Sequence, residues 1–187
     1  MVRYLFKWLG TVALGLLVIG GVFVFHEWNA SKPLFVDNFY NRAFIKYILR
    51  SPESLTSMGI LDAIGIHGHN AEWDDESIAA EDAEFDYVAD IMDSMRRYPD
   101  ASLTPGQLLS KKVVMELLGD PEEARRYRYH DYPVNQISGL QISIPRFLDT
   151  FHRVENARDA RHYVERLSRI DTKMEQAMEG LLVREEM

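Results

Sequence analysis

Two histidines separated by one glycine are the first candidates for metal chemistry in the sequence. His67 and His69 are followed closely by three acidic residues, Asp74, Asp75 and Glu76. Imidazole and carboxylate groups bind zinc and other divalent cations, and the glycine would let the two rings converge. The alternative, which we favour, is a polar loop whose acids precede a helix, with Asp74 or Asp75 as the cap of that helix. His67 and His69 remain the metal candidates of this sequence.

A second group of imidazoles and carboxylates lies nearer the C-terminus. His152 and His162 flank Glu155 and Asp159, and positions 155, 159 and 162 would share one face of a helix. Three arginines crowd the same stretch: Arg158, Arg161 and Arg166. Because charge pairs at these helical spacings are common, we favour a salt-bridged surface over a metal site.

A partial peptidase motif occurs at His26 and Glu27. The pair begins like the helical zinc-peptidase motif H-E-x-x-H, but position 30 is alanine, and the full motif occurs nowhere in the chain. A glycine-rich phosphate loop, a nucleophile elbow and a Ser–His–Asp signature are absent as well. The basic run from Arg125 to Tyr129 fits either an anion site or the C-terminal end of a helix. We therefore expect no catalytic residue and no cofactor in this chain.

The composition excludes further classes of function. The 187 residues include no cysteine, which excludes disulfides, thiolate zinc sites, Fe–S clusters and a cysteine nucleophile. The net charge of −8 argues against a nucleic-acid partner, because nucleic-acid binding needs a basic surface. The apolar fraction of 47% is sufficient for a packed core, so the chain is not disordered.

Helical signals run through residues 33–187, which we expect to form one irregular multi-helix, all-α domain. Ser51, Thr104 and Asp120 each precede a proline, as is typical of a cap followed by the first helical residue. The longest periodic run is the last, from Ala160 to Leu181, with apolar residues at every third or fourth position. We also expect a loop over residues 60–75, a helix over residues 76–97 and a short helix that opens at residues 143–145. No strand-like alternation of useful length occurs.

Residues 1–32 have the pattern of a membrane signal anchor with a short linker. Residues 8–25 carry no charge and approach the ~20 residues that a helix needs to cross a bilayer. Arg3 and Lys7 precede this run, which predicts a cytoplasmic N-terminus and an exported domain. Trp8 and Trp28 bracket the run and suit the two membrane interfaces. A cleaved signal peptide is the alternative, but no A-x-A-like site follows the apolar core. We expect a single-pass membrane protein, with lipid contact through residues 8–25 and an extracytoplasmic domain.

The exported part resembles a known bacterial family. The features that carry the resemblance are short motifs in a fixed order: Ser51–Ile60, Trp73–Ser77, Tyr132–Gln136, Gly139 with Gln141, Ile144–Leu148, and Tyr163 with Arg166 and Leu167. Over roughly residues 35–182 the chain resembles the N-terminal part of the family called Domain of Unknown Function 885. The resemblance implies an all-helical relative of zinc peptidases whose metal ligands lie downstream of this region. It assigns no zinc ligand to any residue of this chain. It also implies that the chain is truncated and forms one wall of a substrate cleft.

Three hypotheses of function follow from these observations. The first is a membrane-anchored, exported helical fragment of a zinc-peptidase-like protein, without catalysis of its own, which pairs with a downstream polypeptide or self-associates through its last helix. The second is a complete small interaction module tethered to the membrane. The third is a small metal-dependent hydrolase that uses His67 and His69.

Overall fold

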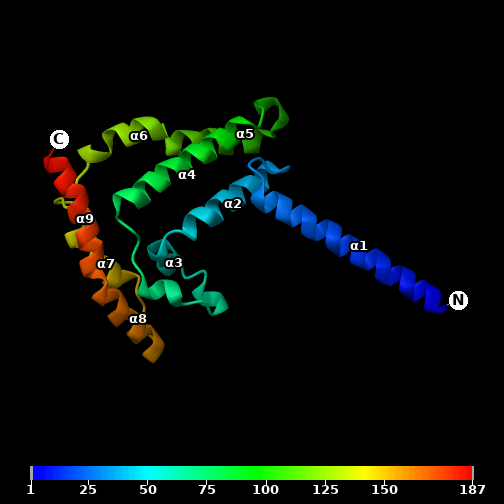
Figure 1. Ribbon diagram of the computed structural model, residues 1–187, viewed down its shortest axis with the longest axis horizontal. Coiled ribbons are helices and arrows are strands. Elements are labelled where there is room, and N and C mark those ends of the chain that lie inside the picture. Colours follow the sequence, from blue (N-terminus) through cyan, green and yellow to red (C-terminus); the bar gives the residue numbers. More distant parts are fainter. Residues whose placement is uncertain (1, 187) are drawn as a thin grey trace.

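The computed structural model describes residues 2–186, and for residues 2–7, 9 and 11 it describes the backbone alone. The side chains of Arg3 and Lys7, on which the predicted orientation depends, therefore lie outside the described set. Figure 1 shows an extended helix at the N-terminal end and a group of helices that carries the C-terminus at the opposite end.

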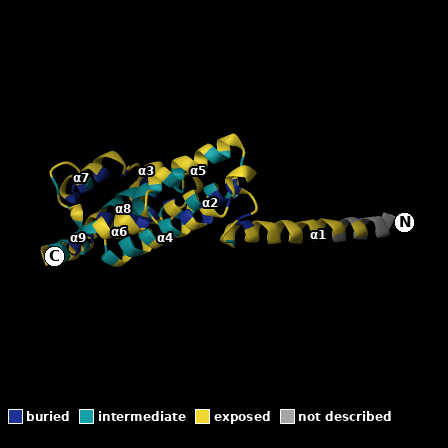
Figure 2. Cartoon of the chain, turned by 90° about the horizontal axis from the view of Figure 1, so that it is seen from above, coloured by how far each residue is buried: buried dark blue, intermediate teal, exposed yellow. Residues whose placement is uncertain are grey.

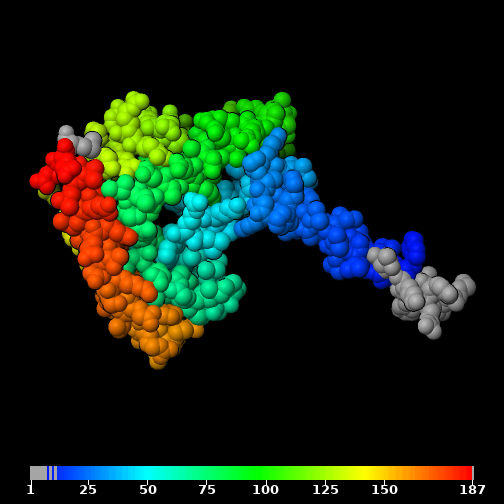
Figure 3. Space-filling view, viewed as in Figure 1, coloured from blue at the N-terminus to red at the C-terminus, as the bar shows by residue number. Residues whose placement is uncertain are grey.

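The first helix, α1 (Val2–Asn29), projects away from the rest of the molecule. It is 28 residues long, and its window from Val12 to Asn29 has a mean hydropathy of 1.5. Figure 2 shows α1 exposed along most of its described length, and in the space-filling view it extends away from the other helices except at its C-terminal end (Figure 3). By length and composition, this helix can cross a membrane.

The remaining elements are helices joined by short turns, and residues 2–186 contain no strand. The α-helices are α2 (Val36–Ile48), α3 (Pro52–Met58), α4 (Ile78–Arg96), α5 (Pro105–Leu118), α6 (Pro121–Tyr127), α7 (Leu140–Thr150), α8 (Ala157–Ser168) and α9 (Ile170–Glu185). The 3-10 turns are η1 (Asp62–Ile64), η2 (Gly68–Ala71), η3 (Asp100–Ser102) and η4 (Arg128–His130). The predicted all-α class is confirmed.

The predicted cap-and-proline starts match the helix boundaries. The side chains of Ser51, Thr104 and Asp120 each accept a hydrogen bond from the first turn of α3, α5 and α6, respectively. At Thr104 the bond is reciprocated by Gln107, which completes a capping box. Gly59 ends α3 with φ +63°, a conformation that side chains with a Cβ rarely adopt.

Two predicted boundaries are wrong. The periodic run from Ala160 to Leu181 is two helices, because Arg169 leaves the helical region with φ −104° and ψ 5°. Its guanidinium donates to the carbonyl of Ala71 at 2.9 Å, a contact that holds the break between α8 and α9. The helix expected to open at residues 143–145 instead begins at Leu140, so Pro145 lies inside α7.

The apolar core consists of two clusters. The first lies where α7, α8 and α9 meet the segment before α4: Trp73, Leu140, Ile144, Phe147, Leu148 and Ala177, with Tyr163, Ile170 and Met174 packed against them. The second joins the start of α2 to the end of α4: Val36, Phe39, Met95 and Tyr98, with partly buried neighbours from α5. The apolar face of the last helix, through which we expected self-association, is thus partly covered by the first cluster, although Met178 remains exposed.

Arg166 of α8 is completely buried and ties α8 to residues 56–72. Its guanidinium donates to the carbonyl oxygens of His69 at 2.7 Å and Glu72 at 2.9 Å, and to the hydroxyl of Thr56 at 2.8 Å. Planar, delocalised Arg is suited to several simultaneous acceptors in a fixed geometry. Arg166 was expected on a salt-bridged surface. That prediction is wrong, because the side chain is buried and its hydrogen-bond acceptors are uncharged groups rather than carboxylates.

Replacing Arg166 with leucine should strongly destabilise the fold. The change leaves buried acceptors without donors, and each unsatisfied group costs about 1–3 kcal/mol, so we expect a total loss on the order of 3 kcal/mol or more. Urea unfolding of the full chain in detergent, followed by far-UV circular dichroism, measures the change. Arg161→Leu is the matched control, because Arg161 lies exposed on the same helix. This variant should unfold at the same urea concentration as the wild type. Equal midpoints for the two variants would contradict the role assigned to Arg166.

Candidate functional site

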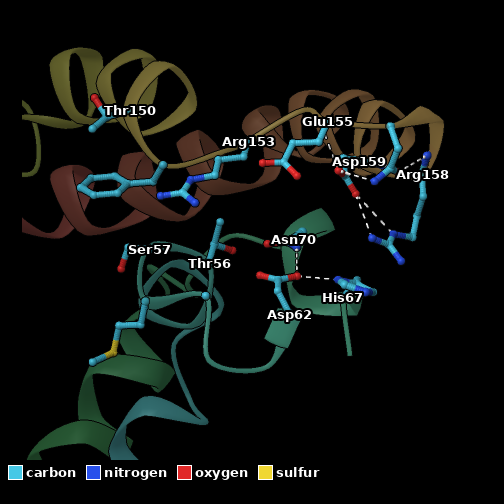
Figure 4. A pocket seen from close by; sticks show the side chains of 14 residues that line it. Thr56, Ser57, Asp62, His67, Asn70, Thr150, Arg153, Glu155, Arg158 and Asp159 are labelled. Atoms are coloured by element: carbon cyan, nitrogen blue, oxygen red, sulfur yellow. Dashed lines mark hydrogen bonds and ion pairs between the residues drawn. The ribbon is translucent and has the colours of Figure 1, made fainter. Parts of the chain in front are cut away.

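A polar cleft of about 380 Å³ lies between two segments that are distant in sequence. One wall is formed by the end of α3 and the turns that follow it, and the other by the end of α7 and the start of α8 (Figure 4). The first wall contributes Thr56, Ser57, Met58, Gly59, Asp62, His67 and Asn70. The second contributes Thr150, Phe151, Arg153, Glu155, Asn156, Arg158 and Asp159.

Asp62 organises the first wall. His67 Nδ1 lies 2.5 Å from its Oδ1, and the amide of Asn70 donates to the same oxygen at 2.8 Å. Burial acts to raise the pKa of Asp62, but the hydrogen bonds from His67 and Asn70 and the nearby imidazoles outweigh it, so the pKa lies below its usual range. Asp62 is therefore ionised at neutral pH and holds His67 at the cleft surface.

His69 lies behind this group and is buried. Its Nε2 is 3.5 Å from Asp62 Oδ2, and neither ring nitrogen has a hydrogen-bond partner. The contact with Asp62 is therefore an electrostatic approach without hydrogen-bond geometry. Burial lowers the pKa of His69, although Asp62 acts in the opposite direction, so the imidazole is neutral at pH 7.

The facing wall is fixed by the start of α8. Asn156 caps this helix by accepting from the backbone N–H groups of Arg158 and Asp159. Asp159 Oδ2 in turn accepts from the side chain of Asn156 at 2.8 Å and from the backbone of Glu155 at 3.2 Å. The guanidinium of Arg158 pairs with the other oxygen of Asp159 at 3.2 Å. The carboxylate of Asp159 is thus occupied by the cap, whereas Arg153 and Glu155 have no such role and point into the cleft (Figure 4).

The structure brings His67 and His69 together around Asp62 rather than around the acids that follow them. Asp74 accepts from the Ser51 hydroxyl at 2.6 Å and from the backbone N–H of Glu53, so it supports the start of α3. Glu76 pairs with Lys173 at 2.7 Å. Ser77 caps α4, so the prediction of Asp74 or Asp75 as that cap is wrong.

Asp62 was missed at the level of sequence. It sits in the apolar run from Ile60 to Ile66, and it reaches His67 because η1 and Gly65, with φ +82°, turn the chain back on itself. The sequence does contain a signal for Asp62: it is a single carboxylate within an apolar run and close to two histidines.

The second predicted cluster, His152 with Glu155, Asp159 and His162, does not form as a helical face. Glu155 precedes α8, which begins at Ala157, so the helical spacing assumed for it does not apply. The salt-bridged alternative holds only for the exposed pair of Arg158 with Asp159.

His152 connects the buried arginine to the cleft. Arg166 donates to its Nδ1 at 3.2 Å, so the ring proton is on Nε2, which faces the carbonyl of Asp159 at 3.4 Å. The ring also lies edge-on against Tyr163, with centroids 5.1 Å apart. Burial is the main cause that lowers the pKa of His152, with the charge of Arg166 acting in the same direction. The imidazole is therefore neutral and supports the second wall.

The basic run and the partial peptidase motif contribute contacts within the fold. Arg125 and Arg128 of the basic run pair with Asp82 of α4 at 3.1 and 2.5 Å, so the run joins α6 to α4. Glu27 binds the backbone ahead of α2. Over residues 2–186, no three His, Asp or Glu side chains are placed to hold a metal ion. The arrangement of the cleft suits the binding of a polar, charged ligand through Arg153, Glu155 and His67.

Replacing His152 with glutamine should make the stability less dependent on pH. Because the folded pKa of His152 is lowered, the unfolded chain takes up a proton near pH ~6.5 that the folded chain resists, so stability is lost as pH falls below that value. Glutamine retains an acceptor for Arg166 and a donor for the Asp159 carbonyl but does not titrate. We expect a smaller difference in free energy of unfolding between about pH 7.5 and about pH 5 than in the wild type.

Urea unfolding at the two pH values measures this difference, with His130→Gln as the control because His130 is exposed. If both variants keep the wild-type difference, His152 is not the neutral, buried link described above.

Comparison with known proteins gives one match. The family described as "Bacterial protein of unknown function (DUF885)" matches residues 52–187, from the start of α3 onward. No curated protein and no solved structure matches the sequence. The matched range starts later than the residue 35 that we expected, but it contains both walls of the cleft and Arg166. Because the match covers well over half of the sequence, the chain belongs to the DUF885 family of bacterial proteins.

Proposed function

We propose that this chain is a single-pass protein of the bacterial inner membrane whose exported helical domain, residues 33–187, forms one wall of a substrate cleft in a zinc-peptidase-like protein. In this proposal the chain binds and positions a polar ligand and performs no catalysis itself. The main support for the proposal is α1, because its side chains are apolar and suit contact with lipid rather than with water.

The exposure of α1 supports the membrane span. Only 6% of the window from Val12 to Asn29 is buried against the rest of the chain. Its large apolar side chains are exposed on all sides, including Leu14, Leu16, Leu17, Val18, Ile19, Val22, Val24 and Phe25. A helix that is apolar all round needs an apolar surrounding, and 28 residues extend about 42 Å, more than the ~30 Å of a hydrocarbon core.

The charges at the ends of α1 support the orientation. Arg3 and Lys7 lie on the N-terminal flank, and basic residues on a flank favour its retention in the cytoplasm. At the other end the carboxylate of Glu27 is buried and engaged with the backbone of residues 34 and 35. The domain that follows would then lie outside the cytoplasm.

The cleft supports the binding role. Arg153 and Glu155 project into it from one wall and His67 from the other, so it offers both charge signs and a ring with donor and acceptor capacity (Figure 4). An extended peptide carries charged ends, amides and side chains that such groups can bind. The zinc-peptidase-like relationship rests on the ordered motifs that resemble the family, among them Tyr132–Gln136 and Ile144–Leu148.

The topology can be tested with single cysteines, since the chain has none of its own. Ile137 lies in a loop of the domain and is 89% exposed, so Ile137→Cys should react with a membrane-impermeant maleimide in cells whose outer membrane has been made permeable. Val2→Cys should react only after lysis, and the protein should stay in the membrane fraction after carbonate washing. Labelling of Val2→Cys alone in unlysed cells, or a mature N-terminus near residue 30, would refute the proposal.

The absence of catalysis predicts a chain without bound zinc. The purified full chain in detergent should hold no stoichiometric zinc and should not hydrolyse fluorogenic peptides. Replacing both His67 and His69 with alanine should change neither result, since His67 is held by a hydrogen bond to Asp62 and His69 is buried behind it. Metal analysis and a peptidase assay on both proteins provide the measurements. One zinc ion per chain that is lost in the double variant would instead favour a small metal-dependent hydrolase.

A further inference from the structure

We propose that the elbow between α1 and α2, residues 30–35, is embedded in the outer leaflet, with Phe35 and Leu34 among the lipid acyl chains. This inference rests on the proposed membrane span and adds a lipid-contact surface that lies outside α1. It follows from the depth at which the elbow folds back along α1.

The contact between two phenylalanines sets this depth. The rings of Phe23 and Phe35 lie 6.3 Å apart in an edge-to-face arrangement. Phe23 is six positions before Asn29, the last residue of α1, which corresponds to about 9 Å along a helix. The elbow therefore returns toward the membrane, and Phe35 lies at the level of Phe23. Wherever Phe23 contacts lipid, Phe35 must lie at the same depth.

The side chains of the elbow suit an apolar surrounding. Leu34 is 68% exposed and Phe35 is 58% exposed, so they do not belong to the core of the domain. They extend the exposed apolar surface of α1 beyond its own helix. Exposure of this continuous apolar patch to water is unfavourable. Lipid acyl chains can cover the patch without removing a polar group from its hydrogen-bond partner.

The backbone of the elbow is satisfied from within on its α2 side. A non-helical backbone is tolerated at membrane depth only when its polar groups have partners. Glu27 Oε1 accepts from the N–H of Leu34 at 2.7 Å, and its Oε2 accepts from the N–H of Phe35 at 3.4 Å. The same carboxylate accepts from the side chain of Asn38 at 2.7 Å. The carboxylate is buried, and three donors occupy it: two backbone N–H groups of the elbow and one side chain of α2.

The α1 side of the elbow is satisfied by Arg42. Its NH1 donates to the carbonyl oxygens of Glu27 at 3.0 Å, Trp28 at 3.1 Å and Ala30 at 2.5 Å. These are carbonyls that the end of a helix leaves without intrahelical partners. The hydroxyl of Tyr98 donates to the carbonyl of Pro33 at 2.7 Å and joins the elbow to the end of α4. Hydrogen bonds from within the chain therefore occupy backbone groups on both sides of the elbow and join it to α2 and α4.

Basic side chains surround the elbow at the level expected for lipid headgroups. Lys46 lies over the ring of Trp28, and Lys32 lies over the ring of Tyr98. Arg97 donates to the hydroxyl of Ser31 at 2.9 Å. An aromatic residue with a neighbouring cation is typical of a membrane interface, where rings lie at the headgroup level and ammonium groups meet phosphates.

Single cysteines carrying an environment-sensitive fluorophore test the insertion in the full chain, reconstituted into phosphatidylglycerol and phosphatidylethanolamine vesicles. Phe35→Cys and Leu34→Cys are the test positions, Val18→Cys reports the span, and Ile137→Cys reports the aqueous domain. Lipids with a quencher on the acyl chain should quench the labels at positions 35 and 34 nearly as strongly as the label at 18, and severalfold more than the label at 137. Far-UV circular dichroism checks that each variant is folded.

The outcomes separate this inference from the proposed function. Quenching at position 18 with values at 35 and 34 equal to that at 137 would overturn the inserted elbow and leave the membrane span in place. No quenching at position 18 would overturn both. A soluble quencher provides the reciprocal measurement, and it should reach position 137 but not positions 34 and 35.

Discussion

The buried guanidinium of Arg166 is the interaction on which the domain depends. Residues 69–72 form an irregular turn whose carbonyl oxygens point inward, and a buried carbonyl without a donor is costly. Arg166 supplies donors to two of these carbonyls from α8, and the indole of Trp73 donates to the carbonyl of Arg166 at 2.8 Å. These hydrogen bonds hold the turn against α8, and they thereby set the distance between the two walls of the cleft.

The charge of Arg166 is stabilised without a direct carboxylate partner. Its guanidinium lies 5.4 Å from the ring centroid of Trp73 and 5.0 Å from that of Phe147, so two aromatic faces contribute to its environment. Burial lowers its pKa to about 10, opposed by Glu53 and Asp74 at longer range, and the group stays protonated at neutral pH. Lys173, whose ammonium lies 5.6 Å from the ring centroid of Trp73, is paired directly with Glu53 at 2.7 Å. The acidic composition of the chain thus includes carboxylates that compensate two buried cations.

The sequence predicted those parts of the structure that depend on neighbouring residues. A Ser, Thr or Asp before a proline marks a helix start wherever the rest of the fold permits it, and all three such sites were correct. The role of Arg166 could not be predicted, because an arginine among acids on a helix has the same local pattern whether it is exposed or buried. Its burial depends on carbonyls and a hydroxyl about a hundred positions away. The cleft was missed for the same reason: its halves were visible as two separate clusters, and only Asp62 and the turn at Gly65 orient the first toward the second.

The contacts of Arg166 join residues that are far apart in the sequence, and this affects the order in which the domain can fold during synthesis. Thr56 and Arg166 are 110 residues apart, and His69 and Arg166 are 97 apart. At a ribosomal rate of 5–20 residues per second, the segment around Thr56 emerges roughly 5–20 s before its partner exists. During this interval the carbonyl of Glu72 and the hydroxyl of Thr56 lack the guanidinium that pairs with them, and the contacts of α8 cannot nucleate early. The first wall of the cleft is therefore completed only after α8 has been made, and until then a chaperone can meet this segment in an open state.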